Sequence, residues 1–311
     1  MRDHFIKRLC NLAENDKRII LVTGDLGFGV FDEYRKRFPE QFINAGVAEQ
    51  NMTGIATGLA MEGYIVFTYS IANFPTLRCL EQIRNDACYH DANVKVVSIG
   101  GGFSYGALGI SHHATEDLAI MRSLPNMTVL SPCGYWETME ATEAAVNTPG
   151  TCYLRLDKSA GDDYPVDKDE RFKVGTARIL SEGEDCVIFV TGGILEEVLG
   201  AKKQLEKKGI GARIVSVHSL KPFDENVVLQ SCRDIGVLVT VEEHTVYGGL
   251  GSVVAETFAK HNVYPKSFLS IGLEAGFSSI VGSQEYLRRS YNLDAESISS
   301  RVQLLFKNGK K

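Results

Sequence analysis

The stretch Phe42–Ala60, which reads F-I-N-A-G-V-A-E-Q-N-M-T-G-I-A-T-G-L-A, predicts a short strand that turns into a helix. Apolar residues recur at helical spacing after the turn, at Met52, Ile55, Ala56 and Leu59. Gly54 and Gly58 leave a stripe without side chains on this helix, where another backbone can approach closely. We therefore expect the helix to be packed on several sides.

Glu49 is the one acid in this otherwise apolar turn. Because a carboxylate is costly to remove from water, we expect Glu49 either to hold a proton near neutral pH or to have a dedicated partner. Both conditions suit proton transfer. The alternative interpretation is an acid that only interacts with the dipole at the start of a helix.

Short β-branched runs alternate with amphipathic segments in the first half of the chain. The expected strands are residues 19–23, 64–68, 94–99, 128–130 and 151–156. The expected helices are residues 2–15, 49–61, 75–89 and 136–147. This alternation is typical of βαβ crossovers, so it predicts an α/β fold with a mostly parallel sheet flanked by helices.

The pattern breaks at residues 158–173, which are polar and charged and have no apolar period. A second α/β series follows, with expected strands at residues 186–190, 212–217 and 237–241 and expected helices at residues 195–208, 252–261 and 295–306. We therefore predict two α/β domains, residues 1–160 and 174–311, joined by a linker at residues 161–173.

The composition is that of a globular protein and argues against several classes. The 311 residues are 44% hydrophobic and 23% charged, and 33 basic against 39 acidic residues give a net charge of −6. The sequence has no basic footprint for nucleic acid and no apolar run long enough to span a bilayer. It also has no metal-ligand cluster and no C-x-x-C pair among its seven cysteines. We expect a cytoplasmic protein without a metal site of its own.

Several segments resemble one family in the order in which that family has them. Gly46–Ala60 is similar to the core motif of the pyrimidine-binding domain of transketolases, thiamine-diphosphate enzymes that transfer two-carbon ketol units. The similarity continues through Arg78–Arg84 (R-C-L-E-Q-I-R), Ser111–Asp117 (S-H-H-A-T-E-D), Met121–Met127 (M-R-S-L-P-N-M) and Glu242–Gly251 (E-E-H-T-V-Y-G-G-L-G). The resemblance implies a pyrimidine-binding domain followed by a transketolase C-terminal domain, that is, the C-terminal half of a transketolase.

A module for the diphosphate is missing from this resemblance. Thiamine-diphosphate enzymes hold the diphosphate through Mg²⁺, usually with G-D-G and a later Asn, because the metal needs carboxylate and amide oxygens. Gly24-Asp25-Leu26 and Gly161-Asp162-Asp163 lack this signature. The resemblance therefore implies a separate N-terminal subunit that carries the diphosphate domain and holds Mg²⁺ (or Ca²⁺). With the glycine stripe, it also predicts that this chain pairs with itself in an α₂β₂ assembly.

The resemblance implies roles for residues around the cofactor. A glutamate at the position of Glu49 hydrogen-bonds N1′ of the aminopyrimidine, which helps the cofactor lose its C2 proton. Aromatic rings clamp the pyrimidine. Phe74, at the best-matching distance from Arg78, is the first candidate for this clamp, and Tyr69 is the second. Ordinary core packing is the alternative for both rings.

Four further residues take expected roles from the resemblance. His112 falls where the family has a histidine that faces substrate oxygens, and an imidazole there can hydrogen-bond an oxygen that gains charge during C–C cleavage. Arg155 falls where an arginine binds the substrate phosphate, although a salt-bridged arginine at a strand end is the alternative. Asp25 matches an acid near the cofactor, or is a turn aspartate. Asp117 is expected to cap the helix that follows it.

The sequence departs from the family at Leu108, where transketolases carry an aspartate that reads a sugar hydroxyl. An apolar side chain cannot select for a hydroxyl, so the usual pentose phosphates are in doubt, and a modified or nucleotide-linked sugar enters consideration. The alternative functions are the β subunit of a 2-oxoacid dehydrogenase decarboxylase and a pyruvate-using enzyme like 1-deoxyxylulose-phosphate synthase. A scaffold without activity is a third, against which the presence of Glu49 and His112 argues.

Overall fold

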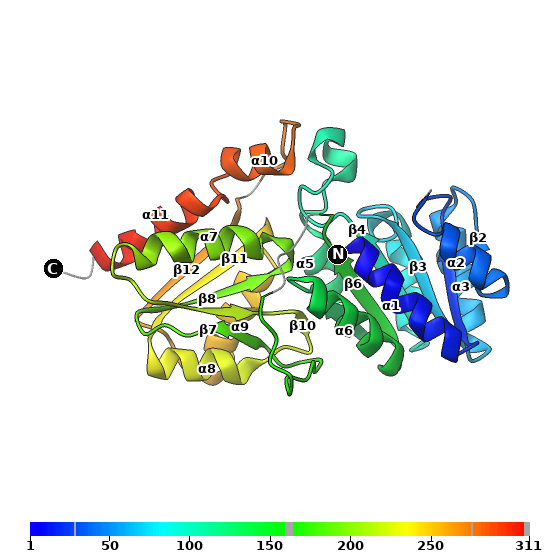
Figure 1. Cartoon of the computed structure of the whole chain (residues 1–311), viewed down its shortest axis with the longest axis horizontal. Coiled ribbons are helices and arrows are strands. Elements are labelled where there is room, and N and C mark those ends of the chain that lie inside the picture. The colour runs from blue at the N-terminus through cyan, green and yellow to red at the C-terminus, as the bar shows by residue number, and fades with distance from the viewer. Residues whose placement is uncertain (28, 159–163, 275, 308–311) are drawn as a thin grey trace.

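The structure, a computed structural model, describes residues 1–27, 29–158, 164–274 and 276–307. It contains two sheets that lie side by side, each between layers of helices (Figure 1). The strand order is β10-β5-β6-β4-β3-β1-β2 in the first sheet and β12-β11-β8-β9-β7 in the second. Most neighbouring strands pair in parallel, which confirms the predicted fold class.

The first sheet comprises β1 (Ile19–Thr23), β2 (Phe42–Asn44), β3 (Ile65–Ile71), β4 (Val94–Ile99), β5 (Met127–Leu130), β6 (Thr151–Leu156) and β10 (Ser219–Lys221). Its longer helices are α1 (Arg2–Asn15), α2 (Asp32–Arg37), α3 (Glu49–Met61), α5 (Asp117–Ser123) and α6 (Tyr135–Asn147). Short helical turns occur at η1 (Pro39–Gln41), η4 (Gly106–Leu108) and η5 (Ile110–His112).

The second sheet comprises β7 (Arg178–Ser181), β8 (Cys186–Thr191), β9 (Ala212–Ser216), β11 (Val237–Thr245) and β12 (Ser267–Leu273). Its helices are η6 (Gly192–Ile194), α7 (Leu195–Glu206), α8 (Glu225–Asp234), α9 (Leu250–His261), α10 (Gln284–Ser290) and α11 (Ala295–Lys307). Helices α7 and α11 pack together over one face, and α8 and α9 cover the other (Figure 1).

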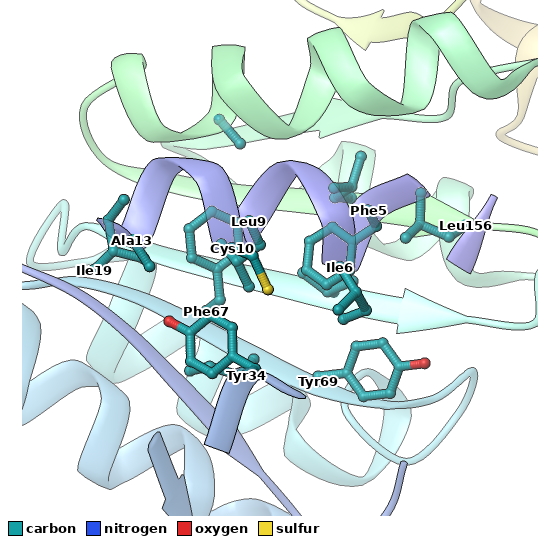
Figure 2. Close-up of a cluster of buried hydrophobic side chains, with 14 of the residues drawn as sticks. Phe5, Ile6, Leu9, Cys10, Ala13, Ile19, Tyr34, Phe67, Tyr69 and Leu156 are labelled. Atoms are coloured by element: carbon teal, nitrogen blue, oxygen red, sulfur yellow. The ribbon is translucent and has the colours of Figure 1, made fainter. Parts of the chain in front are cut away.

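The two faces of the first sheet bury different sets of side chains. Phe67 and Tyr69 of β3 point to the face that α1 covers, where they meet Phe5 (Figure 2). Val66, the neighbour of Phe67, points to the opposite face, where it packs with Met52 of α3. This alternation follows from the two-residue repeat of a strand, and it decides which residues of β3 can reach the start of α3.

Strand β10 comes from the second half of the chain but pairs antiparallel with β5 of the first sheet, with Ser219 opposite Leu130. The two halves are therefore joined by backbone hydrogen bonds. Residues 161–163 of the predicted linker lie outside the described residues. Near the end of that linker, the ring of Phe172 stacks on the ring of His218, with 4.1 Å between their centroids.

The helix expected over residues 75–89 has a more varied geometry than its sequence pattern predicts. It begins after Pro75, which has no N–H to donate, as the 3₁₀ turn η2 (Leu77–Cys79). It continues as α4 (Leu80–Gln82) and ends as the π-helical segment η3 (Ile83–Cys88). Across the described part of the chain, every helix is too short or too polar to cross a bilayer.

Candidate active site

The candidate site lies where parallel strands of the first sheet end. Strand β1 leads into the turn at Asp25, β2 into the turn before Glu49, and β3 into the segment that holds Phe74 and Arg78. Strand β4 leads into the loop that holds His112. Because these strands are parallel, the segments meet at one edge of the sheet, which is where α/β folds bind their ligands.

Asn44 fixes the turn between β2 and α3. Its Oδ1 accepts hydrogen bonds of 3.0 Å from the backbone N–H groups of Gly46 and Asp25. Its Nδ2 donates a 2.9 Å hydrogen bond to Oδ1 of Asp25. Asp25 has a positive φ of 58°, a conformation that aspartate tolerates better than most residues. The predicted acid thus occupies a turn that is tied to the start of α3.

Glu49 is the first residue of α3, and its side chain is only 3% exposed. Arg78 Nη1 lies 2.9 Å from Glu49 Oε2, and the Arg78 side chain is 48% exposed. A side chain on Gly24 would begin 3.4 Å from Glu49 Cγ, so the β1 turn packs closely against the acid. The structure therefore gives Glu49 the dedicated partner that its apolar surroundings predict.

Phe74 joins this pair to the histidine. The Arg78 guanidinium lies 4.7 Å from the centroid of the Phe74 ring, a cation–π distance. The rings of Phe74 and His112 meet edge to face, with centroids 5.1 Å apart and an interplanar angle of 73°. We call Glu49, Arg78, Phe74 and His112 the Glu49 cluster. Its members come from three segments that are far apart in the sequence.

Tyr69, the second candidate for the clamp, does not join the Glu49 cluster. Its ring lies in the core under α1, near Phe5 (Figure 2). The ring meets Phe31 edge to face, with centroids 4.7 Å apart, and stacks on Phe5 at 6.1 Å. Burial raises the pKa of Tyr69 well above its ordinary value. The structure therefore gives Tyr69 the core packing that was the alternative interpretation, because its side chain leaves β3 on the face opposite to α3.

Neighbouring polar groups hold His112 and its loop. Asn73 Nδ2 donates to the carbonyl oxygen of His113 at 2.6 Å and to that of Ser111 at 3.4 Å. Ser111 Oγ lies 2.9 Å from His112 Nδ1. Burial, and then the neighbouring His113, lower the pKa of His112 below its ordinary value. Both effects favour the neutral form of the His112 imidazole.

Arg155 lies away from the cluster, between the two halves of the chain, and is 2% exposed. Its Nε is 3.0 Å from Asp117 Oδ2, and its Nη2 donates to the carbonyl oxygens of Ala114 and Glu243 at 3.0 Å each. The structure thus shows the salt-bridged arginine that was the alternative to a phosphate ligand. The predicted cap is also wrong, because α5 begins at Asp117 without a side-chain cap and Asp117 instead accepts a 2.6 Å hydrogen bond from Tyr153.

Tyr105, which the sequence pattern did not single out, lies near His112, and Lys158 lies against Tyr105. The Tyr105 ring centroid is 6.4 Å from that of His112, and Lys158 Nζ is 5.1 Å from the Tyr105 centroid. Lys158 comes two residues after the end of β6, so its place near the carboxyl edge of the sheet was a usable signal. Leu108, on η4 in the same loop, is 56% exposed.

The Glu49 cluster fits an aminopyrimidine ring in chemical terms. It offers a buried carboxyl group, and because Arg78 is bonded to Oε2, Oε1 is the oxygen that can meet a ring nitrogen. Phe74 offers an aromatic ring within reach of the same guanidinium. Among the described residues, no group of three or more His, Cys, Asp and Glu is arranged to hold a metal ion.

Comparisons with known proteins point to one family. The chain matches the family models of the transketolase pyrimidine-binding domain over residues 1–162 and of the transketolase C-terminal domain over residues 175–298. An apulose-4-phosphate transketolase subunit of Phocaeicola vulgatus is 35% identical over 298 residues, covering 96% of this chain and 94% of that protein. The 6-deoxy-6-sulfo-D-fructose transketolase subunit SqwH of Clostridium sp. is 35% identical over 299 residues, covering 96% and 92%.

The fold is also similar to a solved structure described as a split gene transketolase, inactive beta4 tetramer. The TM-score is 0.86 and the sequence identity 37%, over 97% of this chain and 96% of that one.

Proposed function

This chain belongs to the transketolase family, and we propose that it is the C-terminal subunit of a split thiamine-diphosphate-dependent transketolase. In this role it transfers a two-carbon ketol unit between sugar substrates. The observation that carries the proposal is the Glu49 cluster, which unites a buried acid, a cation, an aromatic ring and a histidine at one edge of the sheet. The relatives named as transketolase subunits, of nearly the same length, support the split arrangement.

The residues of this chain would bind and orient the cofactor's pyrimidine end. When bound, thiamine diphosphate supplies a nucleophilic carbon and accepts the electrons of the cleaved C–C bond. Glu49 would share a proton with N1′ through Oε1, while Arg78 holds Oε2 and so fixes the plane of the carboxyl group. Phe74 would stack on the pyrimidine, and Asp25 would line the β1 turn beside Glu49.

His112 would donate a hydrogen bond to a substrate oxygen that gains negative charge. If the Ser111 hydroxyl donates to Nδ1, the proton of the neutral ring is on Nε2, which is then the donor. Asn73 keeps the backbone on both sides of His112 in place through its two hydrogen bonds. A fixed donor of this kind costs little reorganisation when the charge develops.

The proposal includes two contacts with other subunits. A separate N-terminal subunit would carry the diphosphate domain and hold Mg²⁺ (or Ca²⁺). A second copy of this chain would pack on α3, where Gly54 and Gly58 are exposed and a Cβ on either would meet nothing within 4 Å. Exposed Val47 and Met61 flank this stripe. We therefore propose an α₂β₂ enzyme in the cytoplasm, with domain boundaries at residues 1–160, 161–173 and 174–311.

The proposed substrates are ketoses with an anionic end group. The two relatives are named for a sugar phosphate and for a sulfo sugar, which share an anionic group. In this chain Lys158 lies against the ring of Tyr105, which neighbours His112, and it would offer a cation for that group. Exposed Leu108 offers no hydrogen bond to a sugar hydroxyl, so modified or nucleotide-linked sugars remain within the proposal.

Donor use tests this function against its alternatives. The chain, reconstituted with a transketolase N-terminal subunit, thiamine diphosphate and Mg²⁺, is offered a ketose phosphate or pyruvate, each with an aldose phosphate acceptor. A transketolase consumes the ketose and leaves pyruvate. Loss of pyruvate with release of CO₂ would instead indicate the 2-oxoacid decarboxylase or the 1-deoxyxylulose-phosphate-synthase type, and would overturn the proposal.

A further inference from the structure

The loop that carries His112 is closed at a narrow neck. Gly102 and Ala114 form an antiparallel bridge, in which the N–H of Gly102 donates to the Ala114 oxygen at 2.8 Å and the N–H of Ala114 donates back at 3.0 Å. Residues 103–113 therefore leave and return through one point, and His112 lies next to the returning end. Whatever holds the neck holds the position of His112.

The second half of the chain holds this neck. Glu243 Oε1 accepts a 2.5 Å hydrogen bond from the N–H of Phe103, and the N–H of Thr245 donates to the Thr115 oxygen at 2.8 Å. A Cβ at Gly102 would lie only 2.5 Å from Glu243 Oε1, and Gly102 has a φ of +59°. The close approach of the carboxylate and the backbone conformation both require glycine there.

Glu243 is itself fixed by α10. Its side chain is 4% exposed, and Arg288 Nε donates to Oε2 at 2.6 Å. Gln284 Nε2 donates to both oxygens, at 3.0 and 3.1 Å. A buried carboxylate that is paired with an arginine and fully hydrogen-bonded is an immobile anchor. The anchor ties β11 and α10 of the second sheet's half to the neck of a loop in the first.

We propose that Glu243 is a positioning residue, through which the C-terminal half sets the place of His112 relative to Glu49, Arg78 and Phe74. The hypothesis that His112 contacts the substrate rests on the proposed function. The hydrogen bond between Glu243 and Phe103, which we call the tether, is independent of it. Glu243 acts through Phe103 and the neck, without touching the substrate. A loop shift of about 1 Å at a reacting group lowers turnover strongly, so the tether has a kinetic consequence.

Glu243→Gln tests whether the carboxylate is the tether. The Glu243 carboxylate accepts hydrogen bonds from the Phe103 N–H, from Gln284 and from Arg288. A glutamine replaces one accepting oxygen with an N–H₂ group, so at least one of these donors loses its acceptor. Glu243→Asp is the second variant, because it keeps the charge that buried Arg288 needs but withdraws the carboxylate from Phe103. It guards against a loss of folding in the first.

The control variant breaks another contact between the two halves. Glu256 of α9 accepts from both terminal nitrogens of Arg122 of α5, at 2.7 and 2.6 Å, and its side chain is 58% exposed. Glu256→Gln weakens this ion pair, which lies away from the neck. It removes the same charge from the same kind of residue.

Amide hydrogen exchange of the isolated chain measures directly how strongly the Phe103 N–H is protected by its bond to Glu243. We expect Phe103 and the rest of the loop to exchange about tenfold faster in Glu243→Gln and in Glu243→Asp, and at the wild-type rate in Glu256→Gln. Wild-type protection of Phe103 in both Glu243 variants would overturn the tether, whatever the enzyme's activity.

A double-mutant cycle in the reconstituted enzyme measures whether Glu243 and His112 are energetically coupled. We expect Glu243→Gln to lower kcat about tenfold with cofactor affinity unchanged, and to have no further effect in a His112→Ala background. Losses that multiply instead would overturn the proposal that Glu243 acts through His112. A failure of the proposed function has a different signature, since the wild-type complex would then transfer no ketol unit while the exchange result stands.

Discussion

Arg78 Nη1 lies 2.9 Å from Oε2 of Glu49, and the two side chains differ sharply in exposure, at 48% and 3%. The carboxyl group of Glu49 is buried, whereas the guanidinium side chain of Arg78 is partly exposed to solvent. This places the carboxyl group in a region of low dielectric constant, where its other oxygen can meet a ligand, while the partly solvated arginine keeps its orientation. Proton exchange at Glu49 and ring stacking beside it should therefore be separable by mutation.

Glu49→Gln should reduce hydrogen–deuterium exchange at the cofactor C2 by about 10²- to 10⁴-fold, the usual range for removal of a general acid or base. The amide keeps the shape but cannot take up a proton. The measurement is exchange in the reconstituted complex, with Glu62→Gln at the exposed end of the same helix as the matched control. Exchange at the wild-type rate in Glu49→Gln would remove Glu49 from proton transfer.

Phe74→Leu should weaken cofactor binding by the assembled enzyme about 2- to 10-fold, the value of one aromatic stacking contact. Tyr69→Leu should leave the dissociation constant unchanged and lower the melting temperature, because its ring packs against Phe31 and Phe5 in the core. Calorimetric titration and thermal unfolding of both variants check this. The reverse order of cofactor affinities would make Tyr69 the clamp.

Gly54→Leu should abolish self-association while the chain stays folded. A side chain at this position meets nothing within 4 Å in the single chain, and leucine favours a helix by roughly 0.5–1 kcal/mol over glycine. A second α3 could not then approach closely. Analytical ultracentrifugation compares it with Lys203→Leu, an equally apolar change at an exposed position of α7. A wild-type dimer with full turnover in Gly54→Leu would exclude the α3 interface.

The free energy of unfolding should decrease at acidic pH because of His244. Its Nε2 accepts a 3.4 Å hydrogen bond from the N–H of Ala119 on α5, and burial lowers its pKa from 6.5 to about 4. The unfolded chain takes up this proton below pH 6.5, but the folded chain does so only near pH 4. The contribution of His244 is therefore complete above pH 6.5 and decreases by about 3 kcal/mol as the pH falls to 4.

His244→Gln removes this titration, so the difference in unfolding free energy between wild type and variant should shrink from pH 6.5 to pH 4. Denaturant unfolding at a series of pH values measures that difference. A difference that stays constant over this range would show that His244 is not protonated on unfolding. Because the Ala119 contact joins the two halves, the same titration reports on their association.

The strands that the sequence predicts best are those whose side chains are buried on both faces. Residues 19–23, 94–99 and 151–156 have the expected bounds because each is a short, mainly apolar run that is buried at every position. Strand β10 cannot be predicted from the sequence pattern, because three residues are too few to show a periodicity. Its partner β5 is also far away in the sequence. Its pairing is a property of the tertiary fold.

The residues of the site also fall into those that the sequence predicts and those that depend on the tertiary fold. Glu49, Phe74, Arg78 and His112 come together because each follows or lies near the end of a parallel strand, which topology alone predicts. Tyr69 and Arg155 do not, because the face that a side chain takes and the acid that pairs with it depend on neighbours outside the local segment. For Glu243 there was no usable signal, since it differs from neighbouring Glu242 only in the face of β11 from which it points.

Cofactor binding by separated and mixed subunits tests the central claim most directly. Thiamine diphosphate with Mg²⁺ is titrated into this chain, into a transketolase N-terminal subunit, and into their equimolar mixture, and consumption of a ketose phosphate is followed in each. We expect tight binding and turnover only in the mixture, because this chain supplies the pyrimidine half of the site. Micromolar binding and ketol transfer by this chain alone would contradict the account.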